Sequence, residues 1–164
     1  MKIFYTLCIF LLLSFCNINA QTSFDKNKLE FGGAIGASFG DYTSVQISPQ
    51  VGYAFTNIFS AGFGVSYLYY DYDSFSKNYA GLDLYARLRP IRNIVLQAQP
   101  ELYRTWGKNI DSKIVPCLLL GGGVILPLGN AGGISFMLSY DVLQNNSSPY
   151  RSQLVYSVGY TIGF

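Results

Sequence analysis

The sequence predicts an all-β fold: an eight-stranded antiparallel up-and-down transmembrane β-barrel. Three observations lead to this prediction. Apolar and polar residues alternate with a period of two through most of the chain after Lys28, which is typical of strands with two different faces. Only 12% of the residues are charged, whereas a soluble domain carries about 25%. The polar face consists mainly of Gly, Ser, Ala and Gln, which is too weakly charged for a surface in water.

The N-terminal segment differs from the rest of the chain and is expected to be a secretory signal peptide. Lys2 provides a positive start, residues 3–15 form an apolar run, and Ile18-Asn19-Ala20 has the character of a cleavage site. The run is shorter than the roughly 20 residues of a membrane-spanning helix. A lipoprotein signal ending at Cys16 is disfavoured because bulky Phe15 stands where that motif has a small residue. The expected domains are therefore a signal peptide, residues 1–20, and a barrel, residues 21–164.

The alternation divides the remaining chain into eight expected strands. Their ranges are 29–39, 45–55, 59–69, 82–89, 96–103, 115–124, 134–142 and 153–164. Each can reach the roughly 9–11 residues that a tilted strand needs to cross a bilayer. Compact turns are expected at 56–57, 91–93 and 129–131, and longer polar loops at 71–78, 107–112 and 144–150. Short turns on one rim and longer loops on the other are typical of outer-membrane barrels, with both chain ends on the short-turn side.

The apolar face is expected to contact lipid. It continues across all eight stretches, and in water it would be a large exposed patch. Aromatic residues gather near both ends of the strands, as in the interfacial girdles of membrane barrels. They are Tyr67, Tyr69 and Trp106 near the loops, and Tyr53, Phe55, Phe59, Tyr160 and Phe164 near the turns. A soluble periplasmic ligand-binding barrel is the alternative; it predicts recovery of the protein without detergent.

Charged residues on the polar face are expected inside the barrel. They are Glu30, Asp83, Arg87, Arg89, Glu101 and Asp141. The interior of an eight-stranded barrel is just wide enough for side chains to fill, so charges there must be paired or hydrated. We expect Arg87 and Arg89 to pair with Glu101 and form a structural plug; the alternative is the constriction of a narrow pore. The inward glycines either make room for large side chains or leave a water-filled lumen.

The composition argues against several classes of function. The sequence contains no His, which removes the usual general base, the Ser-His dyad and most zinc sites. A net charge of +2 without a Lys/Arg run argues against nucleic-acid binding. After the expected signal peptide, Cys117 is the single cysteine, so no internal disulfide is expected. No catalytic residue, metal site or cofactor is therefore predicted.

The C-terminal stretch carries a recognisable motif. Residues 156–164 have apolar residues at every second position and end on Phe164. This resembles the C-terminal signal of bacterial outer-membrane β-barrels, which implies that Tyr160, Ile162 and Phe164 are read by the barrel-assembly machinery. The chain after residue 20 is similar in length and layout to the small eight-stranded outer-membrane barrels, the family that includes the transmembrane domain of outer-membrane protein A.

The resemblance implies an integral protein of the bacterial outer membrane, in contact with outer-membrane lipid. We expect a structural or interaction role without catalytic activity. Two alternatives remain open: a narrow pore for ions or small solutes, and surface adhesion or ligand binding through the loops at 71–78 and 144–150.

Overall fold

The structure is a computed structural model that describes residues 25–39, 43–72, 75–106, 112–129, 132–150 and 153–163. The predicted signal peptide, most of the predicted loop at 107–112 and Phe164 lie outside these residues. Within the described part of the chain, no helix is both long and apolar enough to cross a membrane.

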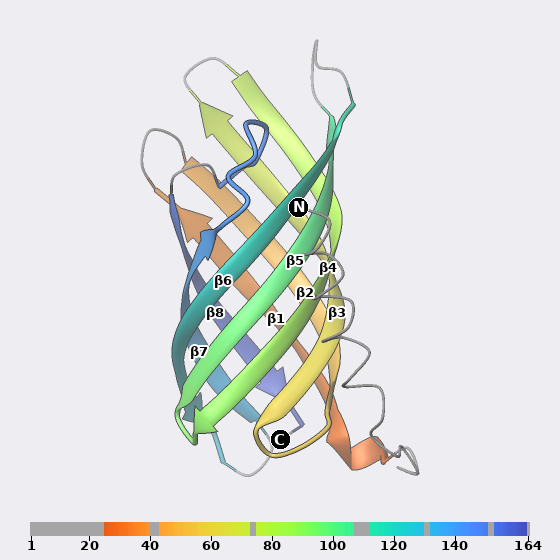
Figure 1. The fold of residues 1–164 in the computed structure, drawn as a ribbon, viewed down its shortest axis with the longest axis vertical. Helices are drawn as coiled ribbons and strands as arrows, with labels where there is room; N and C mark the ends of the chain where they lie inside the picture. Colours follow the sequence, from red (N-terminus) through yellow and green to blue (C-terminus); the bar gives the residue numbers. More distant parts are fainter. Residues whose placement is uncertain are drawn as a thin grey trace, which may run out of the picture.

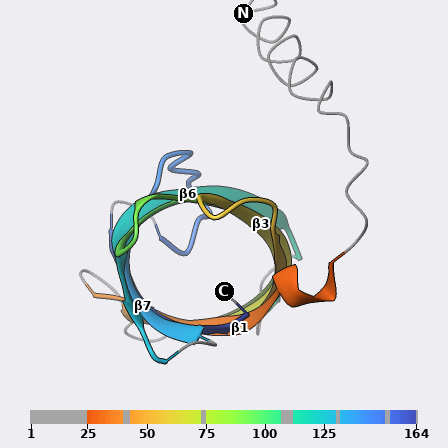
Figure 2. The same cartoon turned by 90° about the horizontal axis from the view of Figure 1, so that it is seen from below.

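Eight antiparallel strands form a closed up-and-down barrel, which confirms the predicted fold class (Figures 1 and 2). A 3-10 turn, η2 (Lys26–Lys28), precedes the first strand. The strands are β1 (Leu29–Ser38), β2 (Thr43–Ala54), β3 (Phe59–Tyr72), β4 (Phe75–Ile91), β5 (Ile94–Trp106), β6 (Ile114–Pro127), β7 (Gly132–Asp141) and β8 (Leu154–Ile162). Each strand pairs with its neighbours in sequence, and β1 pairs with β8 to close the sheet. Closure leaves no edge strand with unpaired backbone groups.

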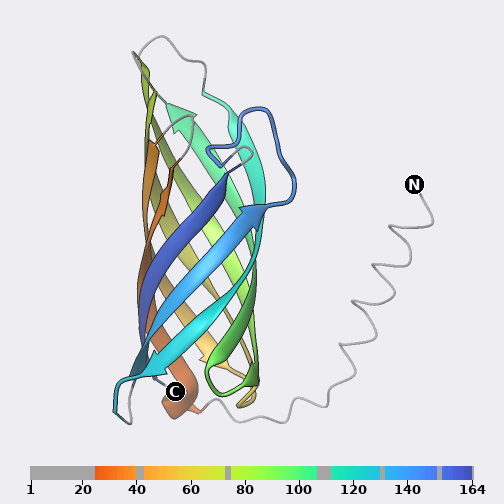
Figure 3. The ribbon, with the colours of Figure 1, turned by 90° about the vertical axis from the view of Figure 1, so that its left-hand side faces the viewer.

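The two ends of the barrel have different connections (Figure 3). At one end, termed the short-turn end, compact connections join β2 to β3, β4 to β5 and β6 to β7. In the first of these turns, Thr56 Oγ1 accepts hydrogen bonds from the backbone N–H groups of Ile58 (3.2 Å) and Phe59 (2.9 Å). The turn η2 and the C-terminal end of β8 also lie there, as predicted. The opposite end is termed the loop end.

The predicted polar loop at 71–78 is wrong. β3 and β4 are 14 and 17 residues long, and they pair up to Tyr72 and Phe75. Strands of this length exceed the roughly 9–11 residues needed to cross a bilayer, so this hairpin projects beyond the lipid. A projecting strand has water on both faces, which removes the polar and apolar alternation while the ladder of backbone hydrogen bonds continues. Polar composition in this stretch was therefore no evidence against paired strands.

Side chains alternate between the exterior and the interior, as predicted. Every strand contributes large apolar side chains to an exposed outer belt, including Ile35, Ile47, Phe63, Leu82, Leu102, Leu126, Phe136 and Val158. Aromatic rings pair at both ends of this belt. The Tyr67 and Trp106 ring centroids are 6.4 Å apart at the loop end, and the Tyr53 and Phe55 centroids are 5.2 Å apart at the short-turn end. Such a belt, exposed around a closed barrel, is the surface that a bilayer requires.

Candidate functional site: the barrel interior

The interior contains three layers of different chemistry. The loop-end cluster is apolar and aromatic and consists of Leu68, Tyr79, Tyr103, Val115, Cys117, Leu119, Tyr150 and Val155. The central polar layer consists of Gln46, Ser48, Gln50, Ser66, Asp83, Arg87, Gln97, Gln99 and Glu101. The short-turn layer combines Glu30, Ser60 and Arg89 with the apolar side chains of Val95, Ile125 and Met137.

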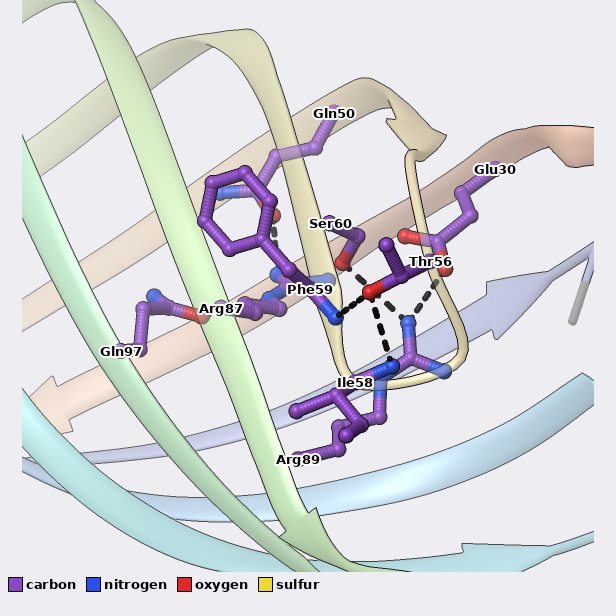
Figure 4. A network of polar contacts seen from close by, with 9 residues as sticks. All are labelled: Glu30, Gln50, Thr56, Ile58, Phe59, Ser60, Arg87, Arg89 and Gln97. Atoms are coloured by element: carbon purple, nitrogen blue, oxygen red, sulfur yellow. Dashed lines mark hydrogen bonds and ion pairs between the residues drawn. The ribbon is translucent and has the colours of Figure 1, made fainter. Parts of the chain in front are cut away.

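An ion pair joins Arg89 of β4 to Glu30 of β1 in the short-turn layer (Figure 4). Arg89 Nη2 donates to Glu30 Oε1 and also to Ser60 Oγ at 3.2 Å. The Glu30 side chain is fully buried, so the guanidinium compensates a carboxylate that water does not reach. This pair ties two strands together across the barrel rather than along the sheet.

The predicted pairing of Arg87 and Arg89 with Glu101 is wrong. The strand register places Glu101 opposite Asp83. Arg89 lies six residues further along β4, which corresponds to about 20 Å along an extended strand. The pairing was predicted because the arginines and Glu101 lie on neighbouring strands. Two residues on neighbouring strands come into contact only when the register of those strands places them at the same height in the barrel.

Arg87 is held by neutral partners. Its Nε donates to Gln97 Oε1 and its Nη2 donates to Gln50 Oε1, each at 2.6 Å (Figure 4). The guanidinium carbon lies 4.1 Å from the centroid of the Tyr85 ring, a cation–π contact. Within the described part of the chain, no carboxylate lies within ion-pair distance of this guanidinium.

Inward glycines make room for Tyr85. A Cβ atom at Gly52 would lie 2.0 Å from Tyr85 Oη, and one at Gly62 would lie 2.7 Å from the same oxygen. Of the two interpretations of the inward glycines, this arrangement favours accommodation of a large side chain over an open lumen at this height.

Asp83 and Glu101 are bound by amides and hydroxyls. Asp83 accepts from Ser66 (2.6 Å), Ser48 (3.1 Å) and Gln50 (3.1 Å). Glu101 Oε1 accepts from Gln99 Nε2 at 2.8 Å and from Gln46 Nε2 at 3.2 Å. Sequence reasoning placed these glutamines on the inner face but did not assign them as partners of the charges. The available signal was the density of Gln at inward positions of the second and fifth expected strands.

Among the voids bordered by described residues of the interior are two with volumes of about 30 Å³ and 10 Å³. The larger is bordered by Gln46, Gln50, Arg87, Gln97 and Gln99, among others. A single water needs about 10–15 Å³ of such volume, so these voids match one or two isolated waters in size. The described side chains therefore fill most of this cross-section.

The loop between β7 and β8 folds into the loop end of the barrel. Tyr150 has no exposed surface, and its hydroxyl donates to Gln46 Oε1 at 2.9 Å. The hydroxyls of Tyr103 and Tyr150 are also 2.9 Å apart. Burial raises the pKa of the Tyr150 hydroxyl well above its usual range, so it stays protonated and able to donate. The loop at 144–150, expected as a polar surface loop, instead contributes its last residue to the interior.

Four tyrosines connect the barrel wall to this loop. The ring centroids of Tyr70 and Tyr79 are 6.4 Å apart, those of Tyr79 and Tyr103 are 6.0 Å apart, and those of Tyr103 and Tyr150 are 6.2 Å apart. All three contacts are edge-to-face, the arrangement that aromatic quadrupoles favour. The sequence analysis missed Tyr79 and Tyr150 as interior residues; the only local signal was an aromatic residue following Pro149 in a polar stretch.

Asp141 anchors the same loop. Its Oδ2 accepts from Ser148 Oγ at 2.6 Å, while Oδ1 accepts from the backbone N–H groups of Leu118 and Leu143, each at 3.1 Å. Asp141 is buried, as its inward position implied, but it binds the loop and β6 and has no hydrogen bond to the central polar layer. Across the described ranges, no group of three or more Cys, Asp or Glu residues is arranged to hold a metal ion.

Comparison with known proteins identifies the fold. No protein-family model matches the sequence, and no curated protein matches it. The N-terminal β-barrel domain of Pseudomonas aeruginosa OprF is similar, with a TM-score of 0.54 and 14% identity over 84% of this chain and 98% of that one. Neisserial surface protein A is similar with a TM-score of 0.52 and 17% identity, over 83% of this chain and 96% of that one.

A de novo designed transmembrane β-barrel is also similar, with a TM-score of 0.52 and 11% identity over 86% of this chain and 98% of that one. At these identities the likeness concerns the fold. The match to a designed barrel indicates that the architecture follows from general rules of strand number and membrane exposure. With its closed sheet and its apolar outer belt, the chain has the fold of the small eight-stranded outer-membrane β-barrels.

Proposed function

We propose that this protein is an integral outer-membrane barrel with a structural or interaction role, a closed interior and no catalytic activity. The observation that carries the proposal is the filled interior: three successive layers of packed or hydrogen-bonded side chains occupy the barrel between its two ends. The charges in these layers contact amides, hydroxyls or each other, as a structural plug requires.

The orientation follows from the connections. In outer-membrane barrels the short turns face the periplasm and the longer loops face outward, so the short-turn end is assigned to the periplasm. The outer belt then contacts outer-membrane lipid. A signal peptide at residues 1–20 directs export, and the barrel-assembly machinery reads Tyr160, Ile162 and Phe164. Tyr160 and Ile162 point outward on β8, where a machinery in the membrane can reach them.

The loop-end arrangement weakens the alternative of adhesion through the loops. The β7–β8 loop uses Ser148, Pro149 and Tyr150 to pack inward, so these residues present no surface to an external ligand. The β3–β4 connection is a strand hairpin, which leaves less loop than the sequence analysis assumed.

Single-channel recording of the refolded chain in a planar bilayer tests the plug against the narrow pore. We expect stable insertion without discrete conductance steps for the wild-type chain. Tyr150→Ala removes the side chain that closes the loop end, and Arg87→Ala removes the guanidinium at the centre of the polar layer. Together these two changes are expected to produce conductance, while Tyr69→Ala, on the lipid-facing side of β3, serves as the matched control.

Discrete steps in the wild-type chain, altered by Arg87→Ala, would instead establish the pore. Insertion is verified separately through Trp106, the single tryptophan, which faces outward beside Tyr67. Quenching of its fluorescence by brominated lipid distinguishes a closed inserted barrel from one that failed to insert. Recovery of the folded chain in buffer without detergent would contradict the membrane location itself.

A further inference from the structure

A vestibule of about 560 Å³ lies at the short-turn end, between the three compact turns. Asn57 and Ile58 border it from the β2–β3 turn, Pro90 from the end of β4, Arg92 from the β4–β5 turn, and Pro127 from the end of β6. This volume is far larger than the two voids deeper in the barrel and falls within the range of small-molecule sites.

Two arginines line the vestibule, and because Arg89 is paired with Glu30, its net positive charge comes from Arg92. Arg89 and Arg92 both line it, and no acidic residue is among the described residues that do so. Glu30, the nearest carboxylate to Arg89, is buried behind that side chain and already paired with it. Asn57 adds an amide to the same wall. The donors facing this space therefore favour a ligand that carries negative charge.

Hydrogen bonds hold the rim of the vestibule in place. Arg89 N donates to Ile58 O at 2.7 Å and links the end of β4 to the β2–β3 turn. Ile125 N donates to Asn93 O at 2.9 Å, and Asn93 Nδ2 donates to Ile125 O at 3.2 Å, which links the β4–β5 turn to β6. Pro90 and Pro127 further restrict the backbone. A rim that is ordered before binding loses less conformational entropy when a ligand arrives.

The inner end of the vestibule is closed. The Arg89–Glu30 pair and the cluster of Val95, Ile125 and Met137 separate it from the central polar layer. A ligand in the vestibule therefore does not reach the central polar layer. Ile58, Ile125 and the two prolines supply apolar surface beside the two guanidinium groups, which suits an organic anion better than a bare inorganic ion.

We propose that the vestibule binds a small soluble organic molecule through a carboxylate or phosphate group, with Arg92 and Arg89 as the cationic contacts. Arg92, which is exposed at the mouth, meets the ligand first, and Arg89 forms the floor. The periplasmic source of the ligand rests on the proposed orientation of the barrel. The proposal that the vestibule binds a ligand does not depend on that orientation.

Calorimetric titration of the refolded barrel in detergent micelles tests this proposal. The probes are glycerol 3-phosphate and citrate, with glycerol as the uncharged control. We expect both anions to bind and glycerol not to bind. Arg92→Gln is expected to weaken binding about tenfold, the loss typical of one charge-assisted hydrogen bond. Arg104→Gln, an exposed arginine of β5 bonded to Ser112 at the loop end, is the matched control and is expected to bind as the wild type does.

Three outcomes would overturn the proposal. One is the absence of anion binding at millimolar concentration in a barrel that shows the gel mobility of the folded state. The other is binding that Arg92→Gln and Arg104→Gln affect equally. The third is displacement of the bound anion by phosphatidylglycerol in nanodiscs. This result would mean that the vestibule binds a lipid headgroup and not a soluble ligand. None of these results depends on conductance, so the proposal of a closed interior and the proposal of a ligand site in the vestibule can be disproved independently.

Discussion

The two halves of the barrel interior are closed in different ways. At the loop end, apolar and aromatic side chains from five strands and one loop pack together, much as in the core of a soluble protein. Toward the short-turn end, closure depends on hydrogen bonds and one ion pair between charged or amide side chains. Packing tolerates small shifts, whereas a buried polar network is stable only when its members are paired. One barrel therefore encloses an apolar core that accommodates small shifts of its side chains and a polar core that requires specific hydrogen-bond partners.

The distribution of small residues explains the contrast. In the short-turn half, Gly52, Gly62 and Gly64 leave gaps beside the inward side chains of Gln50 and Ser60 on β2 and β3. Long side chains of the neighbouring strand β4, such as Tyr85 and Arg87, extend into that space. In the loop-end half, apolar side chains and the rings of Tyr79, Tyr103 and Tyr150 pack into one cluster. Small residues of β2 and β3 are thus matched by long side chains of the neighbouring strand β4.

The largest expected effect is the loss of the ion pair in the short-turn layer. Arg89→Ala leaves the carboxylate of Glu30 buried without its guanidinium. Breaking one partner of a buried pair typically costs about 3–5 kcal/mol of unfolding free energy. Urea unfolding of the barrel in lipid vesicles measures this change. Arg92→Ala, at the exposed mouth, is the control and is expected to change stability by less than about 0.5 kcal/mol. Equal effects of the two changes would contradict the specific role of the pair.

The next effect concerns the loop-end half. Tyr150→Ala removes a fully buried ring and its bonds to Gln46 and Tyr103, and is expected to cost about 3 kcal/mol. It should also open access to Cys117, which is buried beneath the loop and lies 3.5 Å from Ser148 Oγ. Maleimide labelling measures this opening: the wild-type thiol is expected to be protected and the variant thiol to react. A protected thiol in the variant would show that the loop does not close this end.

An intermediate effect tests the fit between glycine and tyrosine. Gly52→Ala places a methyl group against Tyr85 Oη and is expected to cost about 2 kcal/mol. Adding Tyr85→Phe removes that oxygen and should recover part of the loss, which a double-mutant cycle in urea unfolding quantifies. Gly122→Ala is the control, because its nearest neighbour is the end of the exposed Leu96 side chain, at 3.3 Å. Strict additivity of the two changes would argue against this steric fit.

The smallest effect is expected on the outer surface. Tyr67→Phe removes the hydrogen bond from the Tyr67 hydroxyl to Asn78 Oδ1, 2.7 Å long and exposed. Water or headgroup atoms can replace the partner, so the expected loss is about 0.5 kcal/mol. The same unfolding measurement applies. A loss as large as that of Tyr150→Ala would mean that the exterior, and not the interior, determines the stability of the loop end.

Much of the architecture follows from local patterns in the chain. Alternation along each stretch assigns its two faces, and Leu82 beside Asp83 is enough to orient that part of β4. Closure follows from the apolar face, because lipid leaves backbone groups of an open edge without partners. The compact turns at 56–57 and 91–93 were likewise readable from sequence. These features depend on neighbours along one strand and on the solvent around it.

Contacts across the barrel were decided only by the tertiary structure. Alternation shows that Glu30, Arg89 and Glu101 face inward, but it does not show which of them share a height. That depends on the register of every strand pair between them, and a shift in one pair changes all the distances beyond it. The inward position of Tyr150 has the same origin, because a loop fills a mouth only when the completed barrel leaves space for it. Strand faces are a local property, whereas pairing across a closed sheet is a property of the whole ring.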